Sequence, residues 1–199
     1  MACEWKNSSD EMKSYHDTEW GVPTHDDKKL FEYLVLESMQ AGLSWQIVLH
    51  KRETMRKCFA NFDVKKVANL NQDDIDQIMK VEAMIKSIRK IQAMITNAQA
   101  FMHVQEEFGS FDQYLWSFSK NQTICYQGRK KGEMVASNQL STIVSKDLKK
   151  RGFKFVGPVI VYSYLQACGI INDHEDDCEC YRYIRQNYPC IDIAEDGIL

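Results

Sequence analysis

Apolar residues recur through most of the chain at the three- and four-residue spacing of amphipathic helices. The longest such pattern predicts one long helix, whose apolar face carries Met84, Ile85, Ile88, Ile91, Ile95, Ala98 and Met102. Shorter patterns predict helices over 28–41, 44–59, 140–150 and 158–167. Gly42, Gly152 and Gly169 follow three of these segments and are typical helix stops.

Candidate helix caps and the scarcity of strand patterns also favour a helical fold. Ser44, Asp63 and Asp73 are expected to cap three helix N-termini. Only 123–126 and 153–156 have the composition of short strands, and 120–137 otherwise lacks a period and is expected to form a loop. The pattern therefore predicts an all-α fold.

Length, composition and charge limit the class of protein. The chain has 199 residues, of which 44% are hydrophobic, which suits one domain with its own core. Its net charge of −3 argues against a protein that coats nucleic acid or an anionic membrane. The sequence has no signal-peptide pattern, no bilayer-spanning window and an odd number of cysteines, seven. We therefore expect a reduced, monomeric protein of the cytoplasm, without a membrane partner or a nucleotide cofactor.

Two cysteines and two histidines near the ends of the chain have the residue types of a zinc site. Cys3 and His16 lie close to the start, and His174 and Cys178 lie near the end, four residues apart. That spacing predicts that the last two share one face of a helical turn. Two thiolates and two imidazoles form a closed tetrahedral set, which suits a structural Zn²⁺ that joins the two terminal segments.

Two alternatives to this zinc site stay open. In the first, Cys180 replaces Cys178 as a ligand, although the four-residue spacing to His174 is then lost. In the second, the four residues are unrelated members of the core. The remaining cysteines show no ligand spacing and are expected to be free thiols: Cys58, Cys125, Cys168 and Cys190.

Glu37 is a carboxyl group on the apolar face of the helix predicted over 28–41. It is either a helix-edge residue in solvent or a buried acid that needs hydrogen bonds or a cation. Trp45 follows it closely, and the N-terminal region adds Trp5, Tyr15 and Trp20. An acid beside aromatic faces suits a flat, cationic ligand such as a flipped, alkylated nucleobase or a quaternary ammonium group. An ordinary aromatic core is the alternative.

A basic turn at 146–157 contrasts with the net negative charge. It holds five basic residues and ends at Gly157, directly before the helix that begins at Pro158. The backbone N–H groups at such a helix start bind anions, and two helices joined in this way are typical of a helix-hairpin-helix that contacts DNA phosphates. A solvated helix end, in which the lysines complement the helix dipole, is the alternative. Acidic residues concentrate instead in 173–179.

Five segments of the chain have highly specific sequences. They are 3–5 (CEW), 15–23 (YHDTEWGVP), 36–45 (LESMQAGLSW), 148–157 (LKKRGFKFVG) and 166–169 (QACG). Together they resemble the 3-methyladenine DNA glycosylase I family, from Cys3 to about Cys178. The resemblance implies an all-α helix-hairpin-helix glycosylase domain over 1–180 with a structural zinc site, followed by a tail over 181–199 of unassigned role.

The function that this resemblance implies is base-excision DNA repair. The N-glycosidic bond of 3-methyladenine in duplex DNA would be hydrolysed, which leaves an abasic site. By position, Glu37 and Tyr15 would hydrogen-bond the extruded base, Trp45 would stack on it, and Trp5 and Trp20 would shape the pocket.

Positions for the metal and the DNA also follow from the resemblance. The zinc ligands would be Cys3, His16, His174 and Cys178. Gly42 and Leu43 would enter the gap left in the base stack. The turn that contains Lys154, Val156 and Gly157 would hold the DNA backbone.

Further expectations concern lyase activity, the role of Asp173 and two places where the chain departs from the family pattern. No lysine stands in a nucleophile context, so we expect a monofunctional enzyme without lyase activity; Asp173 is expected to support the zinc ligand His174 rather than to activate water. The chain has Ser38 where the family has glycine, and Met84-Ile85-Lys86-Ser87-Ile88 where it tends to have Ile-Ile-Arg-Asn-Arg. The alternative function is a non-catalytic, zinc-stabilised helical module that binds DNA or a methylated ligand.

Overall fold

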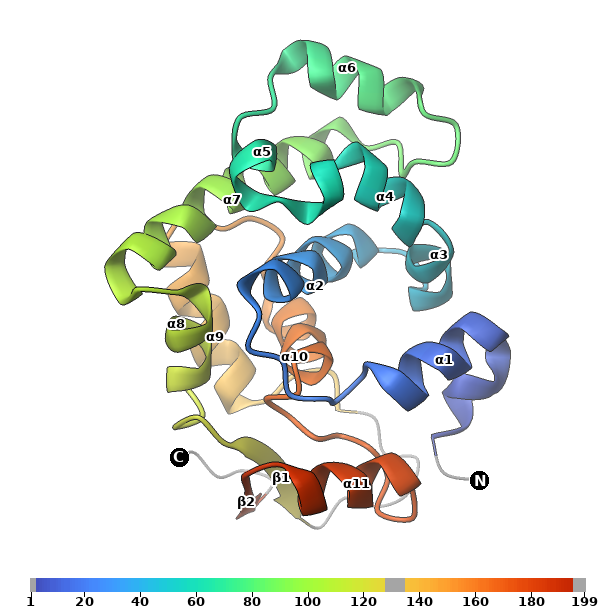
Figure 1. The fold of residues 1–199 in the computed structure, drawn as a ribbon, viewed down its shortest axis with the longest axis vertical. Helices are drawn as coiled ribbons and strands as arrows, with labels where there is room; N and C mark the ends of the chain where they lie inside the picture. Colours follow the sequence, from blue (N-terminus) through green and yellow to red (C-terminus); the bar gives the residue numbers. More distant parts are fainter. Residues whose placement is uncertain (1–2, 128–134, 195–199) are drawn as a thin grey trace.

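The computed structural model describes residues 3–127 and 135–194 (Figure 1). The basic stretch 128–132 of the predicted loop lies outside these residues. In chain order the elements are η1 (Glu4–Ser8), α1 (Asp10–Thr18), α2 (Asp27–Gln40), α3 (Trp45–His50), α4 (Arg52–Cys58), η2 (Ala60–Phe62), α5 (Val64–Ala68), α6 (Gln72–Lys80), α7 (Ile88–Phe108), α8 (Phe111–Ser117), β1 (Thr123–Gln127), α9 (Gln139–Lys150), α10 (Pro158–Ala167), α11 (Glu179–Asn187) and β2 (Cys190–Ala194).

Helix α2 lies at the centre of the molecule, between the helices drawn around it in Figure 1. Every residue from 30 to 39 is buried, and α2 packs against α7, α8 and α10. A helical stretch that is buried on all sides is expected to be apolar all round, and residues 30–39 are, apart from Ser38 and two glutamates, Glu32 and Glu37. Those two acids therefore need a specific explanation.

Glu32 is explained by a buried network of ion pairs. Arg52 of α4 donates to Glu32 Oε1 at 2.8 Å and to both carboxylate oxygens of Glu19 at 2.8 and 2.7 Å. Lys29 adds a 2.8 Å hydrogen bond to Glu19, and these partners lower the pKa of that carboxyl to about 2 against the opposing effect of burial. The network joins the end of α1 to α2 and α4.

Most predicted helices are confirmed, with small shifts at their ends. The helix predicted over 158–167 is α10, and those predicted over 28–41 and 140–150 are α2 and α9. The long helix begins at Ile88 rather than at Met84, because Ser87 caps it, and it continues to Phe108. Ser44 and Asp63 cap α3 and α5 as expected.

Three local predictions are wrong. The segment 44–59 is two helices, since the chain turns at Lys51 between α3 and α4. The cap of α6 is Asn71 rather than Asp73, and its side chain accepts from the backbone of Asp73 and Asp74 in a capping box. The segment 153–156 is no strand, because it forms the turn between α9 and α10, where Phe155 has a positive φ of 54°.

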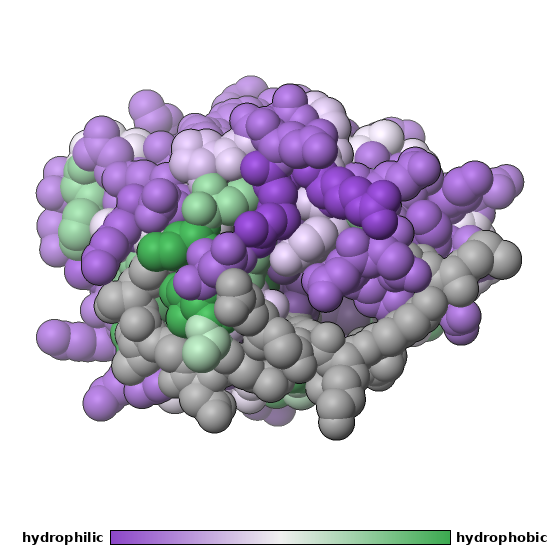
Figure 2. All heavy atoms as spheres, turned by 90° about the horizontal axis from the view of Figure 1, so that it is seen from below, coloured by the Kyte–Doolittle hydropathy of each residue, from purple (hydrophilic) through white to green (hydrophobic). Residues whose placement is uncertain are grey.

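The predicted all-α fold is confirmed for the helices, but it is incomplete because the structure also contains a two-stranded sheet. Strand β1 pairs in parallel with β2, with Thr123 opposite Cys190. The sequence pattern identified β1 as a strand candidate but missed β2. Both strands and α11 lie at the lower end of Figure 1. Among the described residues on this face, Figure 2 shows mostly hydrophilic side chains, with a group of hydrophobic ones left of the centre. Within the residues that the structure describes, we find no helix with the length and apolar character needed to cross a membrane.

Candidate functional site

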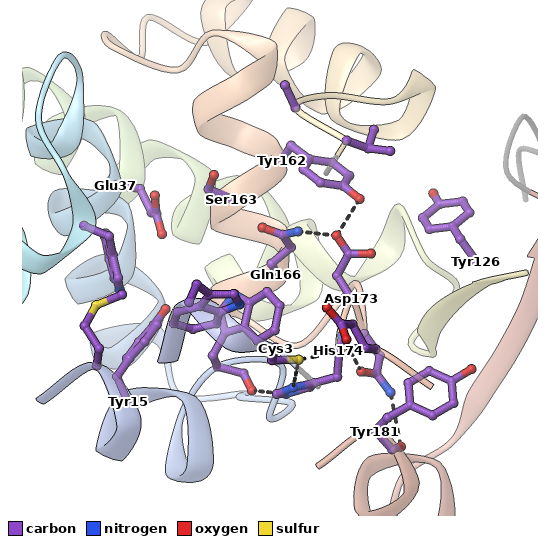
Figure 3. A pocket seen from close by; sticks show the side chains of 18 of the residues that line it. Cys3, Tyr15, Glu37, Tyr126, Tyr162, Ser163, Gln166, Asp173, His174 and Tyr181 are labelled. Carbon is purple, nitrogen blue, oxygen red and sulfur yellow. Dashed lines mark hydrogen bonds between the residues drawn. The ribbon is translucent and has the colours of Figure 1, made fainter. Parts of the chain in front are cut away.

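A pocket of about 610 Å³ opens between α1, α2, α10 and the segment that leads into α11. It brings together five residues that the sequence singled out: Trp5, Tyr15, Trp20, Glu37 and Trp45. Its volume falls in the range of pockets that enclose a small organic ligand. Figure 3 shows its side chains, which come from elements far apart in the chain.

Glu37 points into this pocket from α2 (Figure 3) and is only 3% exposed. Its Oε2 atom is buried and has no hydrogen-bond partner within the described part of the chain. Burial raises the pKa of this carboxyl to about 8, so at neutral pH the group is mostly a neutral acid. An unpaired buried carboxyl group is costly, which indicates that a ligand completes its hydrogen bonding.

Trp45 and Tyr15 form an aromatic wall next to Glu37. Their ring centroids lie 5.2 Å apart, at an angle of 52°. The indole Nε1 of Trp45 is a second buried polar atom for which the described residues supply no partner. Tyr15 is 4% exposed, and burial together with the nearby Glu37 raises the pKa of its hydroxyl well above 10, so it stays protonated. The wall therefore offers a stacking face and unused donors.

Trp5 and Trp20 connect the pocket to the histidines below it. Their rings meet edge to face, with centroids 5.0 Å apart. Trp20 also packs against His174 at 4.5 Å, and Trp5 against His16 at 5.3 Å. These two tryptophans line the pocket and at the same time contact the histidines of the Cys/His cluster.

The opposite wall contains residues that sequence reasoning missed. Tyr162, Ser163 and Gln166 of α10 line the pocket. Tyr162 donates a 2.9 Å hydrogen bond to Asp173, and the Gln166 amide donates to the same carboxylate oxygen (Figure 3). The available signal was the pair Ser163 and Gln166, polar residues three apart in an otherwise apolar helix.

Asp173 therefore belongs to the pocket wall. Its carboxylate accepts hydrogen bonds from Tyr162 and Gln166 of α10. The expected support of His174 by Asp173 stays a prediction. Tyr181, from the segment without an assigned role, lines the pocket as well.

The four predicted metal ligands converge beneath the pocket. Cys3, His16, His174 and Cys178 are all buried, and their ligand atoms lie within 4.8 Å of one another. The separations are 3.1 Å between the two facing histidine nitrogens and 3.7 to 3.9 Å between sulfur and nitrogen atoms. A tetrahedral zinc with ordinary bond lengths has edges of about 3.3 Å for two nitrogens and about 3.6 Å for nitrogen and sulfur. The donor set and its spacing fit a zinc ion.

Surrounding groups orient both imidazoles towards this centre. His16 binds the Asp17 carboxylate through Nδ1 at 2.7 Å, which leaves Nε2 facing inward. His174 donates from Nε2 to the Trp20 carbonyl at 2.9 Å, which leaves Nδ1 facing inward. Such outer contacts are typical of histidines that ligate metals. Burial lowers the pKa of His174 to about 4, which keeps it in the neutral form that a metal requires.

The structure favours Cys178 over Cys180 as the fourth member of the cluster. The reason is not the helical turn that the spacing from His174 to Cys178 predicted. Cys178 belongs to the set of four, whereas Cys180 groups only with His16 and Asp17. The predicted helical turn is absent: His174 lies in an irregular segment, and Cys178 is the extended residue directly before α11. The ligands converge because this segment folds back over α1.

Gly42 and Leu43 form the turn between α2 and α3, in which Gly42 is exposed and Leu43 is half-buried. Gly42 has a φ of +78°, and nothing lies within 4 Å of the Cβ that another residue would place there. The turn is held from behind by Lys90 of α7, whose Nζ donates to the carbonyls of Met39 and Ala41 at 2.8 and 2.7 Å. The two residues are therefore at the surface of a well-anchored turn.

Within the basic segment 146–157, residues 146–150 form the end of α9. Residues 151–157 form the turn that joins α9 to α10, and these two helices pack against each other. Ser145 holds this turn from inside through a 2.6 Å hydrogen bond to the carbonyl of Val156. The backbone N–H groups of Val156 and Gly157 have no partner among the described residues, and Lys154 is exposed. The turn therefore presents unused donors at the start of α10, which is the arrangement that binds anions.

Fold and site together define a helical protein with an acidic, aromatic pocket beside two exposed turns, the arrangement of a helical DNA glycosylase. Residues 5–182 match the family model described as methyladenine glycosylase, and the chain belongs to that family. It is 45% identical over 179 residues to DNA-3-methyladenine glycosylase 1 of Escherichia coli strain K12. The aligned region covers 90% of this chain and 96% of that protein.

Solved structures of similar proteins agree with this assignment. The 3-methyladenine DNA glycosylase I of Staphylococcus aureus has a TM-score of 0.85 at 36% identity, over 89% of this chain and 94% of that one. A 3-methyladenine DNA glycosylase I in complex with 3-methyladenine gives the same TM-score at 35% identity, over 89% and 95% of the two chains.

Proposed function

We propose that this protein is a base-excision repair enzyme that hydrolyses the N-glycosidic bond of 3-methyladenine in alkylated duplex DNA and leaves an abasic site. The observation that carries the proposal is the pair of unpartnered buried atoms, Glu37 Oε2 and Trp45 Nε1, in one aromatic pocket. A base flipped out of the duplex would supply the missing hydrogen bonds and a flat surface for the rings. A similar protein binds 3-methyladenine, which supports this ligand.

The charge of the substrate explains why this pocket would select it. Methylation at N3 makes the base in DNA cationic and hence a good leaving group. Trp45 and Tyr15 attract a cation through their ring faces, and a cation next to Glu37 favours the ionised carboxylate that burial otherwise disfavours. An uncharged adenine offers neither interaction, so the pocket discriminates by charge and Glu37 selects and orients the base rather than acting as a strong general base.

The reaction would be simple hydrolysis. The bond to an already cationic base breaks with oxocarbenium character at the sugar, and water takes the base's place. The described residues that line the pocket include no lysine, which supports the absence of an imine intermediate and of lyase activity. The strand would therefore remain intact at the abasic site.

The Cys/His cluster would hold one structural zinc ion. Its four protein ligands leave no open coordination position, so Zn²⁺ would supply cross-linking rather than chemistry. The cluster fixes the N-terminal segment with Trp5 against the segment of His174, and both contribute to the pocket. Metal binding would thus support the pocket walls.

The two exposed turns would contact the DNA. Gly42 and Leu43 would enter the gap in the base stack. The turn with Lys154, Val156 and Gly157, as part of a helix-hairpin-helix, would hold the backbone. Residues 1–180 would form the glycosylase domain, with Tyr181 of the following segment adding to the pocket wall. We retain the predictions of a monomer and of a cytoplasmic location.

Release of free base from alkylated duplex DNA tests the proposal. We expect the purified protein to release 3-methyladenine, detected by chromatography and mass, without breaking the strand. Glu37→Ala is expected to slow release roughly 10- to 100-fold, the range for a lost hydrogen bond to a charged group. Glu53→Ala, which removes an exposed carboxylate on α4, is the matched control.

Two outcomes would contradict the proposal. Binding of the alkylated duplex without any base release would favour the non-catalytic binding module. A Glu37→Gln variant that binds the methylated base normally but loses all excision would show that Glu37 acts in the chemical step rather than in selection.

A further inference from the structure

Helix α7 anchors both of the turns that are proposed to contact DNA. Lys90, near its start, holds the end of α2 next to Gly42 through two carbonyls. Asn97, two turns further along, binds the basic turn by accepting from the Lys154 N–H at 2.7 Å and donating to the Lys154 carbonyl at 3.0 Å. Residues seven apart lie on nearly the same helix face, so α7 spaces the two turns rigidly.

A separate groove lies between these anchors on the surface of α7. It has a volume of about 390 Å³ and is lined by Arg89, Gln92, Ala93, Thr96, Lys154 and Phe155. Two cations, an amide and a hydroxyl thus face one space, and none of the described acidic residues lines it. No role is predicted from the sequence pattern for Arg89, Gln92 or Thr96.

The cations of this groove are not used by the fold. Arg52, Arg56, Arg151 and Arg185 each pair with a carboxylate. By contrast, none of the described acidic residues forms an ion pair with Arg89 or Lys154, and the Arg89 side chain is exposed. Unpaired cations beside hydrogen-bond donors in a hollow are complementary to a phosphate group.

We propose that this groove is a DNA phosphate site, in which Arg89, Gln92 and Lys154 bind the backbone between the Gly42–Leu43 turn and the 151–157 turn. The proposal rests on the proposed action on DNA. It adds Arg89 and Gln92 of α7, which lie outside the pocket and outside the two turns, to the contact made by Lys154. From residue 89 to residue 96 the helix rises by about 10 Å, so the groove takes one or two phosphates. The groove lies along the stretch of α7 that carries Lys90 and Asn97, the two residues that anchor these turns.

Salt dependence of DNA binding tests this site, because each phosphate contact adds about 0.9 to the slope of log affinity against log salt. We would measure binding of a duplex with an abasic-site analogue to Arg89→Gln and, as a matched control, to Lys28→Gln. Lys28 is an exposed cation at the opposite end of α2 from Gly42. The Arg89 variant is expected to lower the slope by about 1, and the control to leave it unchanged.

A second variant probes the groove without removing a cation. Gln92→Glu keeps the side-chain size and places a negative charge next to Arg89, so it is also expected to weaken DNA binding. Both groove variants are expected to bind free 3-methyladenine as the wild type does, since the pocket is separate. That readout also confirms that they are folded.

The outcomes separate this site from the proposed function. Equal salt slopes for wild type, Arg89→Gln and Lys28→Gln would overturn the phosphate site, whether or not base is released. Loss of free-base binding in the groove variants would also overturn it, because the effect would then act through the pocket. A wild type that binds DNA with the expected slopes but releases no base would instead refute the excision proposal alone.

Discussion

Burial determines what Glu37 can do in this molecule. The carboxyl group is enclosed by α2 and the pocket, and none of the described cations pairs with it, so its pKa rises to about 8. Glu19 shows the opposite effect, because Arg52 and Lys29 lower its pKa to about 2. The same functional group is thus neutral at one position and firmly ionised at the other.

Replacement of Glu37 by glutamine gives a test of this burial. The pKa of Glu37 is higher in the folded protein than in the unfolded chain, so its contribution to stability is fully present below about pH 4.5 and is lost as the pH rises towards 8. We therefore expect the free energy of unfolding of the wild type to fall by about 4 kcal/mol relative to Glu37→Gln between pH 5 and pH 9. Urea unfolding of both proteins across this range measures the difference, and parallel pH profiles would contradict a buried, neutral Glu37.

At the scale of elements, ion pairs and capping connect helices that the sequence pattern describes only one by one. Periodicity identified α2, α7, α9 and α10, because each buries a long apolar face. The break at Lys51 was missed, since the apolar residues of α3 and α4 continue one pattern through it. Strand β2 was missed because only its partner β1, more than sixty residues earlier, makes it a strand.

The buried network around Arg52 is expected to stabilise the junction of α1, α2 and α4. Arg52→Met would leave Glu32, which is 4% exposed, with fewer cations, and we expect a loss of about 3 kcal/mol in the free energy of unfolding. The control is Arg185→Met, which breaks the more exposed pair with Asp192 and is expected to cost less than about 1 kcal/mol. Equal effects of the two substitutions in chemical denaturation would contradict the importance of burial here.

At the scale of the whole molecule, the site forms where segments that are far apart in the sequence come together. The residue types Cys3, His16, His174 and Cys178 could be selected from the sequence, and so could Glu37 with its aromatic neighbours. Their meeting could not be derived from local pattern, because it depends on how the segment around His174 folds over α1. The pocket wall from α10 was missed for the same reason, since Tyr162 and Gln166 look like ordinary helix residues until Asp173 is placed beside them.

Net charge is likewise a poor guide at this scale. The net charge of −3 is a sum in which acidic residues near the pocket outweigh the cations of the chain. Those cations include unpaired ones on α7 and the basic turn. The local distribution of charge is compatible with DNA contact at the groove and the basic turn, whereas the total charge is not informative.

Metal removal tests how far the ends of the chain depend on each other. We expect about one equivalent of zinc in the purified protein, and a strong chelator is expected to lower the melting temperature by about 10 °C or more, because binding energy at such sites is folding energy. Cys178→Ser is expected to lose the metal. Cys58→Ser, which changes a half-buried thiol outside the cluster, is expected to keep it. Zinc content that is the same in both variants would contradict the four-ligand site.

The ligand of the pocket can be tested directly by nuclear magnetic resonance of the indole N–H groups. The chain has four tryptophans, and their environments differ: Trp45 Nε1 lacks a partner among the described residues, whereas Trp116 Nε1 donates to the Thr24 carbonyl at 2.9 Å. On titration with free 3-methyladenine, we expect the Trp45 signal, assigned with Trp45→Phe, to shift strongly while that of Trp116 stays in place. Saturation of the protein with 3-methyladenine without any shift of the Trp45 signal would contradict the placement of the base against Glu37 and Trp45.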